Sequence, residues 1–531
     1  MAATAAPSTT HVGAPAPAAT SAPIDRRRMF AFICMVFGMF MAILDIQIVS
    51  ASLAEIQAGL SASSDEISWV QTSYLIAEVI MIPLSGTLSR VLSTRWMFVI
   101  SSAGFTLMSV MCAFSSSINE MIVWRALQGF IGGGMIPTVF ASAFTIFPRE
   151  KQSIVSPIIG LVATLAPTIG PTIGGYLTDL FSWHWLFLVN IVPGIFVTVS
   201  TYLLIDFDEP QLDLFKSFDW TGLGLMAAFL GCLEYVLEEG PTNDWLQDEA
   251  VLICTVICVA GGIGFFWRAL AAKHPIVDLY AFKDRNFAAG CAFSFVMGIG
   301  LYGLTYLYPL FLARVRGYSA LQIGETMFVT GICMFLMAPI AGRLMRSMDP
   351  RLMMAIGFTS FAAGTWIVSG LTKEWDFWEL LVPQILRGIG LMICMVPINN
   401  TALGTLAPER MKNASGLYNL TRNLGGAVGL ALINTVLNDR MDLHLQRLHD
   451  NVGWSRGVAV ETLNNLTLSF DRLGSDAGQA ALKTLSNMVR REALVMSFGD
   501  VFVILSFLFV ALAFATPFVR KPRAAPPADA H

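Results

Sequence analysis

Residues 125–148 read RALQGFIGGGMIPTVFASAFTIFP, and residues 384–408 read QILRGIGLMICMVPINNTALGTLAP. Each stretch begins with Arg, Gln and Gly in close order and contains two prolines eleven residues apart. These prolines are Pro137 and Pro148 in the first stretch, and Pro397 and Pro408 in the second. On the topology predicted below, both stretches cross a membrane in the same direction, so the chain contains a parallel repeat. Parallel halves related by an axis along the membrane normal are one of two common transporter designs, in which the substrate path lies between the halves.

The composition also places the chain in a membrane. Of its 531 residues, 55% are apolar and 13% are charged, and the mean hydropathy is +0.64. Soluble domains carry about 25% charged residues, so a chain with so few charges cannot form the polar surface of a soluble protein. We therefore predict an all-α integral membrane protein with many spans. The net charge of −4 also argues against a nucleic-acid partner, which requires a basic surface.

Several kinds of chemistry have no signature in the sequence. The eight cysteines lie in apolar stretches without CxxC spacing, the six histidines form no HExxH pattern, and no GxxxxGK[ST] phosphate cradle occurs. Such patterns indicate metal sites, disulfide frameworks and nucleotide binding. We expect no metal, no cofactor and no enzymatic activity.

Fourteen apolar windows are long enough to cross a bilayer, which takes about 20 residues. They are residues 29–51, 69–88, 96–115, 121–145, 154–178, 184–205, 220–237, 249–270, 287–312, 320–342, 352–371, 378–404, 414–437 and 494–517. Basic clusters flank both ends of this region, namely Arg26, Arg27 and Arg28 before it and Arg520, Lys521 and Arg523 after it. Both termini are therefore predicted to be cytoplasmic, which an even number of spans permits.

The remaining basic residues agree with this topology. Twenty of the 33 fall in the loops and tails assigned to the cytoplasm, whereas the opposite short loops hold three, Arg314, Arg316 and Lys373. Cytoplasmic loops of membrane proteins carry an excess of Lys and Arg. The other ten lie within spans or in the long segment 438–493, which is placed outside the cytoplasm.

The repeat and the spans divide the chain into successive units. We expect a disordered cytoplasmic tail at 1–28, an N-terminal six-helix half at 29–205, two inserted helices with flanking loops at 206–286, a C-terminal six-helix half at 287–517 and a cytoplasmic tail at 518–531. The second half includes the long extracytoplasmic loop 438–493, where leucines alternate with polar residues and predict short amphipathic helices. Long loops are often functional, so this one is either a docking surface or a cover for the outer face.

Charged side chains deep within a span are costly and mark candidate functional sites. Asp45 lies midway along the first span, Glu78 in the second and Arg125 in the fourth. Burial disfavours the charged form of a carboxylate and a nearby arginine favours it, so a carboxylate whose surroundings alternate can load and release a proton. We hypothesise that Asp45 and Glu78 are protonation sites and that Arg125 biases one of them. The alternative is a static Asp45–Arg125 pair that only fixes helix packing.

Other polar residues within spans are candidates for contact with a substrate or for lining a cavity: Gln47, Gln128, Gln384, Arg387 and Arg422. Arg422 lies near a span end, where membrane anchoring is an equal alternative. Glu234, Glu325 and Asp500 also lie near span ends, where snorkelling or helix capping suffices. Aromatic and methionine side chains suit an adaptable cavity and equally suit ordinary packing. Examples are Phe293, Phe295, Met297, Tyr302, Tyr306 and Tyr308.

The fifth span is rich in proline and glycine. It contains Pro167, Gly170, Pro171, Gly174 and Gly175. Small residues four positions apart let helices approach closely, and proline removes a backbone hydrogen bond so that a span can bend. The pattern predicts a tight helix pair, a flexing point, or both.

Several of these stretches resemble motifs of a known family. Residues 170–177, GPTIGGYL, resemble the antiporter motif of drug exporters in the major facilitator superfamily, and residues 125–129, RALQG, resemble their fourth-span motif. Residues 44–49, LDIQIV, resemble the first-span motif of its fourteen-span drug:proton antiporters. Further similarity occurs at residues 183–193, 275–287 and 408–410. The resemblance covers about residues 30–517 and is greatest to EmrB-like multidrug pumps.

The resemblance implies a fold and a function. The fold would be a major facilitator fold of two six-helix halves plus two inserted helices, and Arg125 would take part in proton coupling. The function would be proton-coupled export of hydrophobic or amphipathic compounds such as drugs from a bacterial inner membrane, with a periplasmic adaptor and an outer-membrane channel as partners. A rival is a dedicated exporter of one metabolite, fatty acid or siderophore. A multispan membrane enzyme or sensor is a less favoured rival, because no clustered catalytic set or soluble effector domain is visible.

The sequence departs from the family pattern in two places. The loop after the second span reads GTLSR at residues 86–90, where the family pattern is Gly-x-Leu-Ala-Asp-Arg, so its acidic residue is missing. An Asp-based cytoplasmic latch is therefore not expected in that loop. The first-span motif departs after Val49, where Ser50–Leu53 replaces the usual ending.

Overall fold

A computed structural model describes seven stretches of the chain. They are residues 26–147, 149–206, 208–272, 275–406, 408–453, 455–470 and 476–519. Over these residues every regular element is a helix, which confirms the all-α prediction. Pro148, residues 1–25 and residues 520–531 lie outside the described residues, and with them most of the two predicted tails.

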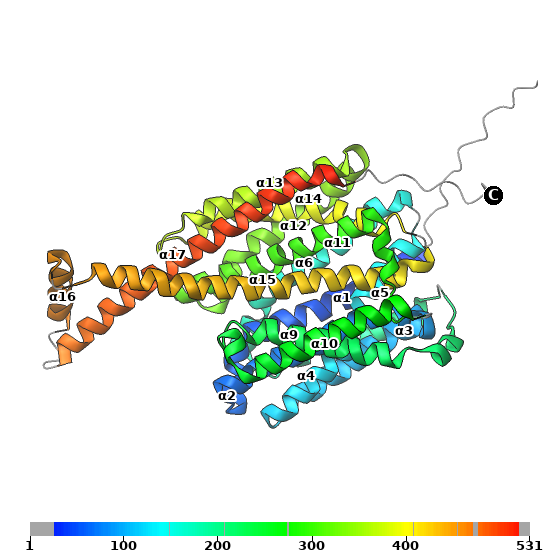
Figure 1. Cartoon of the computed structure of the whole chain (residues 1–531), viewed down its shortest axis with the longest axis horizontal. Helices are drawn as coiled ribbons and strands as arrows, with labels where there is room; N and C mark the ends of the chain where they lie inside the picture. The colour runs from blue at the N-terminus through cyan, green and yellow to red at the C-terminus, as the bar shows by residue number, and fades with distance from the viewer. Residues whose placement is uncertain are drawn as a thin grey trace, which may run out of the picture.

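The first half of the chain folds into a bundle of helices. Its helices are α1 (Arg26–Ala51), α2 (Leu53–Leu60), α3 (Ser64–Ala113), α4 (Ile118–Gly132), α5 (Met135–Ile146), α6 (Arg149–Leu180), α7 (Trp185–Leu188) and α8 (Ile191–Leu204). Within it, α3 packs on α4 and α8, and α1 packs on α6 and α8. Figure 1 shows α2, α3 and α4, in blue to cyan, in the lower part of the view, whereas α6 lies near its centre.

The inserted segment follows as two helices packed on each other. They are α9 (Trp220–Glu239) and α10 (Glu249–Ala271), with short 3-10 turns η1 (Leu212–Ser217), η2 (Trp245–Gln247) and η3 (Leu279–Lys283) in the connections. The pair attaches to the first half through contacts between α9 and α3, and α9 also touches α15 of the second half. The inserted helices therefore reach both halves of the protein.

The second half repeats the arrangement of the first. Its helices are α11 (Arg285–Phe311), α12 (Ala320–Ser347), α13 (Pro350–Ser369), α14 (Phe377–Leu403), α15 (Pro408–Asn451) and α17 (Ala477–Ala515), with η4 (Leu312–Arg316) extending α11 and η6 (Thr516–Phe518) ending α17. The two halves meet where α6 packs on α12 and α14, and where α15 packs on α3 and α5.

Twelve helices in the described part of the chain are long and apolar enough to cross a membrane. One of them, Glu66–Ala113, contains the predicted span 69–88 and most of the predicted span 96–115. The two are separated by a kink at Ser93, whose φ of 76° is not helical. The predicted span 414–437 lies in α15, which is not among the twelve. An integral membrane fold is confirmed, whereas the number fourteen stays a prediction.

The segment 438–493 differs from the short amphipathic helices expected for it. Most of it continues α15 to Asn451 and begins α17 at Ala477, and the short helix α16 (Gly457–Ser469) lies between them. Figure 1 shows α15 and α17 extending out of the bundle to α16, and we call this projection the hairpin. The side of the bundle from which it projects is the hairpin end. The opposite side, where α1 begins and α17 finishes, is the terminal end. An alternating leucine pattern suits both a short surface helix and the exposed part of a long one.

The repeated motif plays the same packing role in each half. Gly129 of α4 lies against the backbone of Tyr74 in α3, with no space for a Cβ atom. Gly388 of α14 lies against the backbone of Thr330 in α12, where a Cβ atom would be 2.8 Å from the carbonyl oxygen. Contact of this kind between helices requires glycine, so the repeat read from the sequence corresponds to a repeated helix contact.

This packing yields a testable prediction for Gly129→Ala. Alanine in a helix interior is normally more stable than glycine by about 0.5–1 kcal/mol, but here the new methyl group meets the Tyr74 carbonyl. Overpacking costs about 1–3 kcal/mol, so the thermal midpoint of the purified protein should fall. Gly224→Ala on α9 is the matched control, because a Cβ atom there meets no atom within 4 Å. Equal midpoints for both variants would contradict the packing assigned to Gly129.

Candidate functional site

A fully buried ion pair lies at the centre of the first half. Arg125 of α4 donates from Nη1 to Oδ2 of Asp45 in α1 at 2.7 Å, and both side chains have 0% exposure. Arg125 also donates from Nε to the carbonyl oxygen of Val70 in α3 at 3.2 Å. Its Nη2 has no hydrogen-bond partner among the described residues. The pair therefore joins three helices and retains one unused donor.

Three neighbouring side chains complete the surroundings of Asp45. Asn190 donates from Nδ2 to Oδ1 of Asp45 at 2.7 Å and to Oγ of Ser109 at 3.0 Å. Gln128 donates from Nε2 to Oδ1 of Asp45 at 3.4 Å and accepts from Arg125 Nη1 at 2.8 Å. Both carboxylate oxygens thus accept hydrogen bonds. Sequence reasoning missed Asn190, although it lies in a stretch that carries the family resemblance.

Glu78 lies one helical turn beyond the ion pair. The guanidinium of Arg125 stacks over the ring of Tyr74, with Cζ 4.2 Å from the ring centroid. Residues four apart on a helix share a face, so Glu78 follows Tyr74 along the same side of α3. Glu78 makes no hydrogen bond or ion pair in the described structure. It also lines a cavity, which Asp45 and Arg125 do not.

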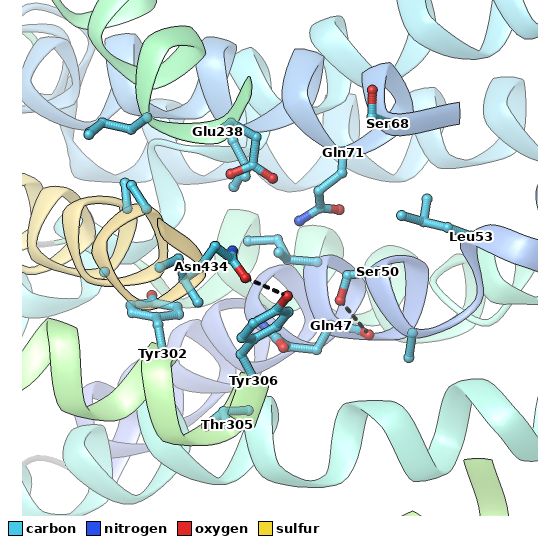
Figure 2. A pocket seen from close by; sticks show the side chains of 18 of the residues that line it. Gln47, Ser50, Leu53, Ser68, Gln71, Glu238, Tyr302, Thr305, Tyr306 and Asn434 are labelled. Carbon is cyan, nitrogen blue, oxygen red and sulfur yellow. Dashed lines mark hydrogen bonds between the residues drawn. The ribbon is translucent and has the colours of Figure 1, made fainter. Parts of the chain in front are cut away.

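The cavity has a volume of about 620 Å³ and lies between the two halves. Its walls come from α1, α3, α6, α9, α11, α12 and α15, and it reaches Leu53 of α2 and Thr242 after α9, at the hairpin end. Figure 2 shows Gln47, Gln71, Glu238, Tyr306 and Asn434 around one central space. Tyr306 donates to Oδ1 of Asn434 at 2.8 Å, which ties α11 to α15. This volume is within the range of about 300–1,000 Å³ that is usual for small-molecule sites.

The candidate residues divide between the cavity wall and the protein interior. Gln47 and Pro171 line the cavity, as do two of the aromatic candidates, Tyr302 and Tyr306. The other polar candidates are buried and do not belong to the wall: Gln128, Gln384, Arg387 and Arg422. The sequence could not separate the wall residues from the interior ones, because which side chains face the cavity depends on the rotation of each helix.

The second half contains a counterpart of the ion pair without its carboxylate. Arg387 of α14 donates from Nη2 to Oγ1 of Thr305 in α11 at 2.6 Å, and its Nε and Nη1 have no partner among the described residues. Gln384 accepts from Thr330 at 3.1 Å and donates to the carbonyl oxygen of Thr326 at 2.9 Å. Arg422 donates to Asn419 at 2.6 Å. The halves share a fold but differ in the charge they bury.

The proline- and glycine-rich motif places α6 between the halves. Gly170 lies against Gln47 of α1 without space for a Cβ atom, and Gly174 lies near the Ile48 carbonyl oxygen. Pro167, Pro171 and Gly175 belong to the same helix, and α6 continues as one helix through these prolines. On its other side, α6 packs on α12. A movement of α6 would therefore change its contacts with both halves and the shape of the cavity wall.

A second polar cluster joins the two halves at the terminal end of the bundle. Asp208, between α8 and α9, accepts hydrogen bonds from the backbone N–H of Thr94 at 3.0 Å and forms an ion pair with Lys412 of α15. Lys412 also donates to the carbonyl oxygen of Ser89 at 2.9 Å. Residues 86–90, which have no acidic residue, lie within α3 and not in the loop expected from the sequence. They are joined to the second half by Lys412, and Asp208 from the connector to the inserted helices pairs with this lysine.

These features define a class of protein. Two similar helical halves enclose a cavity that reaches one end of the bundle, and a polar cluster joins them at the other end; this is the architecture of a membrane transporter that works by alternating access. The family model of the Major Facilitator Superfamily matches residues 35–430. The chain belongs to this superfamily, whose members are transporters rather than enzymes.

Individual proteins are similar to this one over nearly the whole chain. It is 45% identical over 490 residues to the colistin resistance protein EmrB of Acinetobacter baumannii, covering 92% of this chain and 96% of that protein. It is 29% identical over 491 residues to the multidrug export protein EmrB of Escherichia coli K12, covering 92% and 95%. The fold resembles the crystal structure of the human organic anion transporter MFSD10, with a TM-score of 0.58 at 12% identity, over 91% of this chain and 100% of that one.

Proposed function

We propose that the protein is a proton-coupled exporter of hydrophobic and amphipathic drugs in a bacterial inner membrane, with both termini in the cytoplasm. The observation that carries the proposal is the Asp45–Arg125 pair, which is fully buried and lies beside a cavity between the halves. A buried ion pair is weak evidence for stability, whereas ionisable groups inside a membrane mark ion and proton pathways. The names of the EmrB relatives support drugs as the substrates.

In this proposal, two carboxyl groups carry the proton in succession. Glu78 at the cavity wall takes up a proton from the outer side, and Asp45 releases one toward the cytoplasm when the helices rearrange. Arg125 contacts the Asp45 carboxylate directly and stacks on Tyr74, one turn from Glu78. Protonation of Asp45 would weaken its attraction to Arg125 and free the guanidinium to move. The arginine then acts as the link between protonation and helix position.

Alternating access would depend on the two ends of the bundle. With the terminal end in the cytoplasm, the cavity faces outward and the Asp208–Lys412 pair keeps the cytoplasmic side closed. Opening would separate α15 from the 86–94 segment, and α6 with its three prolines is the proposed flexing element. Gln47 and Pro171 at the wall are proposed to contact substrate; Gln128, Gln384, Arg387 and Arg422 are proposed to shape the helices behind it.

The transport assay that tests this function uses purified protein in liposomes. A pH gradient is imposed across the membrane, and a panel of dyes, detergents and fatty acids is tested for movement and for proton release. Uptake of several chemically unrelated amphipathic compounds, each with proton release, is expected. Movement of a single compound class would favour a dedicated exporter, and movement unaffected by the pH gradient would contradict proton coupling.

The projecting hairpin supports a proposal about partners. The ends of α15 and α17 and all of α16 extend beyond the bundle (Figure 1), on the side proposed to face the periplasm. We propose that this hairpin docks a periplasmic adaptor that leads to an outer-membrane channel. Elements that project from a bundle gain little from packing on it, so their surfaces are free to contact another molecule.

Removal of α16 tests the docking proposal. Replacing residues 452–476 with a short flexible linker should abolish co-purification of the adaptor, while transport in liposomes stays unchanged because the cavity is untouched. The liposome assay serves as the control for folding. Unchanged co-purification in the shortened protein would show that the adaptor binds elsewhere.

A further inference from the structure

We propose that the cavity selects lipophilic cations and that the inserted helix α9 supplies the carboxylates that select them. This inference rests on the proposed function, since it assigns a substrate class to the proposed export cavity. It gives the inserted helices a role in recognition, in addition to any role in lipid contact. The argument depends on the charges of the wall, on their lack of partners and on the apolar and aromatic groups around them.

The charges of the cavity wall all have the same sign. Four glutamates line it, Glu78, Glu234, Glu238 and Glu239, and the lining residues include no Lys, Arg or His. Among the described residues, no cluster of His, Cys, Asp and Glu is suited to hold a metal ion. The ionisable side chains of the wall are therefore all acidic, and no basic side chain of the wall balances them. A bound anion would be repelled by every ionised group of the wall.

Two of these carboxyl groups are buried and unpartnered. Glu78 is 3% exposed and Glu234 is 6% exposed, and neither makes a hydrogen bond or an ion pair within the described part of the chain. Glu239 differs, because its carboxylate accepts hydrogen bonds from Thr72 at 3.3 Å and Asn243 at 3.5 Å. Buried charges in proteins are usually paired. A cationic ligand would supply the missing partner for Glu78 and Glu234.

The position of α9 explains why its carboxyl groups face the cavity. Residues four apart lie on one side of a helix, so Glu234 and Glu238 share the face that α9 turns toward α3 and α15. Figure 2 shows Glu238 pointing into the space that Gln71, Asn434 and Tyr306 surround. The inserted helix thus completes a wall that the two six-helix halves leave uncharged except at Glu78.

The rest of the wall suits the apolar part of such a ligand. Leu75, Leu237 and Leu430 come from three different helices, and Tyr302 and Tyr306 add aromatic rings. Aromatic faces attract cations, most strongly where water is excluded. Carboxylates, tyrosines and aliphatic side chains together fit a bulky cation with apolar substituents. A neutral compound would gain the apolar contacts and leave the carboxyl groups unpartnered.

Binding of two ions that share a shape tests the inference. Tetraphenylphosphonium and tetraphenylborate have nearly the same size and opposite charge. Equilibrium dialysis against the purified full-length protein, with protein-free micelles subtracted, should show saturable binding of the phosphonium and none of the borate. Each carboxylate near the cation should contribute about tenfold in affinity, so Glu234→Gln with Glu238→Gln should weaken phosphonium binding by at least tenfold.

The controls separate charge selection from loss of folding and from failure of the export function. Glu325→Gln removes a carboxylate from α12 at an exposed position outside the cavity wall and should leave binding unchanged. Thermal midpoints report whether each variant is folded, and Glu234→Gln alone is used if the double variant is unstable. Binding needs no pH gradient, so it is independent of coupled export. Equal affinity for the two ions, or unchanged phosphonium binding in a folded variant, would overturn the inference.

Discussion

Liposomes that contain the Asp45→Asn variant are expected to lose all substrate movement driven by a pH gradient. Asparagine retains the size and one oxygen acceptor of aspartate, so the hydrogen bond from Arg125 can persist, but the amide cannot exchange a proton. The expected loss follows directly from the proposed role of Asp45 as a proton carrier. Asp179→Asn is the matched control, since it makes the same change at an exposed position near the end of α6. Full activity of Asp45→Asn would remove Asp45 from the proton path.

A paired substitution distinguishes a proton carrier from a static ion pair. Asp45→Asn leaves the buried Arg125 charge without its counter-ion, and removing one partner of a buried pair costs about 3–5 kcal/mol. Arg125→Gln in the same protein removes that uncompensated charge, so the thermal midpoint should recover. Coupled transport should not recover, because the carboxyl group is still missing. A double variant that regains both stability and transport would show that the pair serves helix packing alone.

The second large effect is expected from Lys412→Met at the terminal end. This substitution removes the ion pair to Asp208 and the hydrogen bond to the Ser89 carbonyl oxygen. The pair is mostly buried, with side-chain exposures of 18% and 25%, and hydrogen bonds to charged groups contribute about 1.5–3 kcal/mol. The closed terminal end should therefore lose about tenfold or more in population relative to the open one.

Chemical labelling at the interface of the halves measures this shift. Ser156 of α6 hydrogen-bonds to Asn400 of α14 at 3.3 Å and is buried, so a cysteine at position 156 should react with a maleimide faster in the Lys412→Met background. Lys216→Met is the control, because the Lys216–Asp213 pair is exposed by 84% and 95% and exposed pairs contribute about 0–1 kcal/mol. Equal labelling rates with and without Lys412→Met would argue that the Asp208–Lys412 pair does not hold the terminal end closed.

The sequence predicted the fold class and the central charges for physical reasons that hold without coordinates. A charge inside a membrane is so costly that Asp45 and Arg125 stand out from their apolar surroundings. The repeated glycines at 129 and 388 also proved to make equivalent helix contacts. By contrast, the contacts of Asn190 and Gln128 with Asp45 could not be assigned from spacing, because they depend on how α4 and the start of α8 pack against α1.

The Asp208–Lys412 pair and the acidic cavity wall could not be predicted from the sequence. The missing acidic residue at 86–90 was visible, but its replacement, Asp208, lies 114 residues after Thr94, in a connector without regular structure. Glu234 was assigned to a membrane interface, where snorkelling would suffice, yet it is buried at the cavity wall. Glu238 was not among the candidates. It lies four residues after Glu234 and so shares its helix face, but the target of that face depends on how α9 packs on α3.

The most direct test of the central claim is the response of net dye movement to reversal of the pH gradient in liposomes. Protein is incorporated in one orientation, the dye is equilibrated across the membrane, and the gradient is applied first in one direction and then in the other. Antiport predicts that dye accumulates on the more acidic side and that the direction of movement reverses with the gradient. Dye movement in the same direction under both gradients, or none under either, would contradict proton-coupled export.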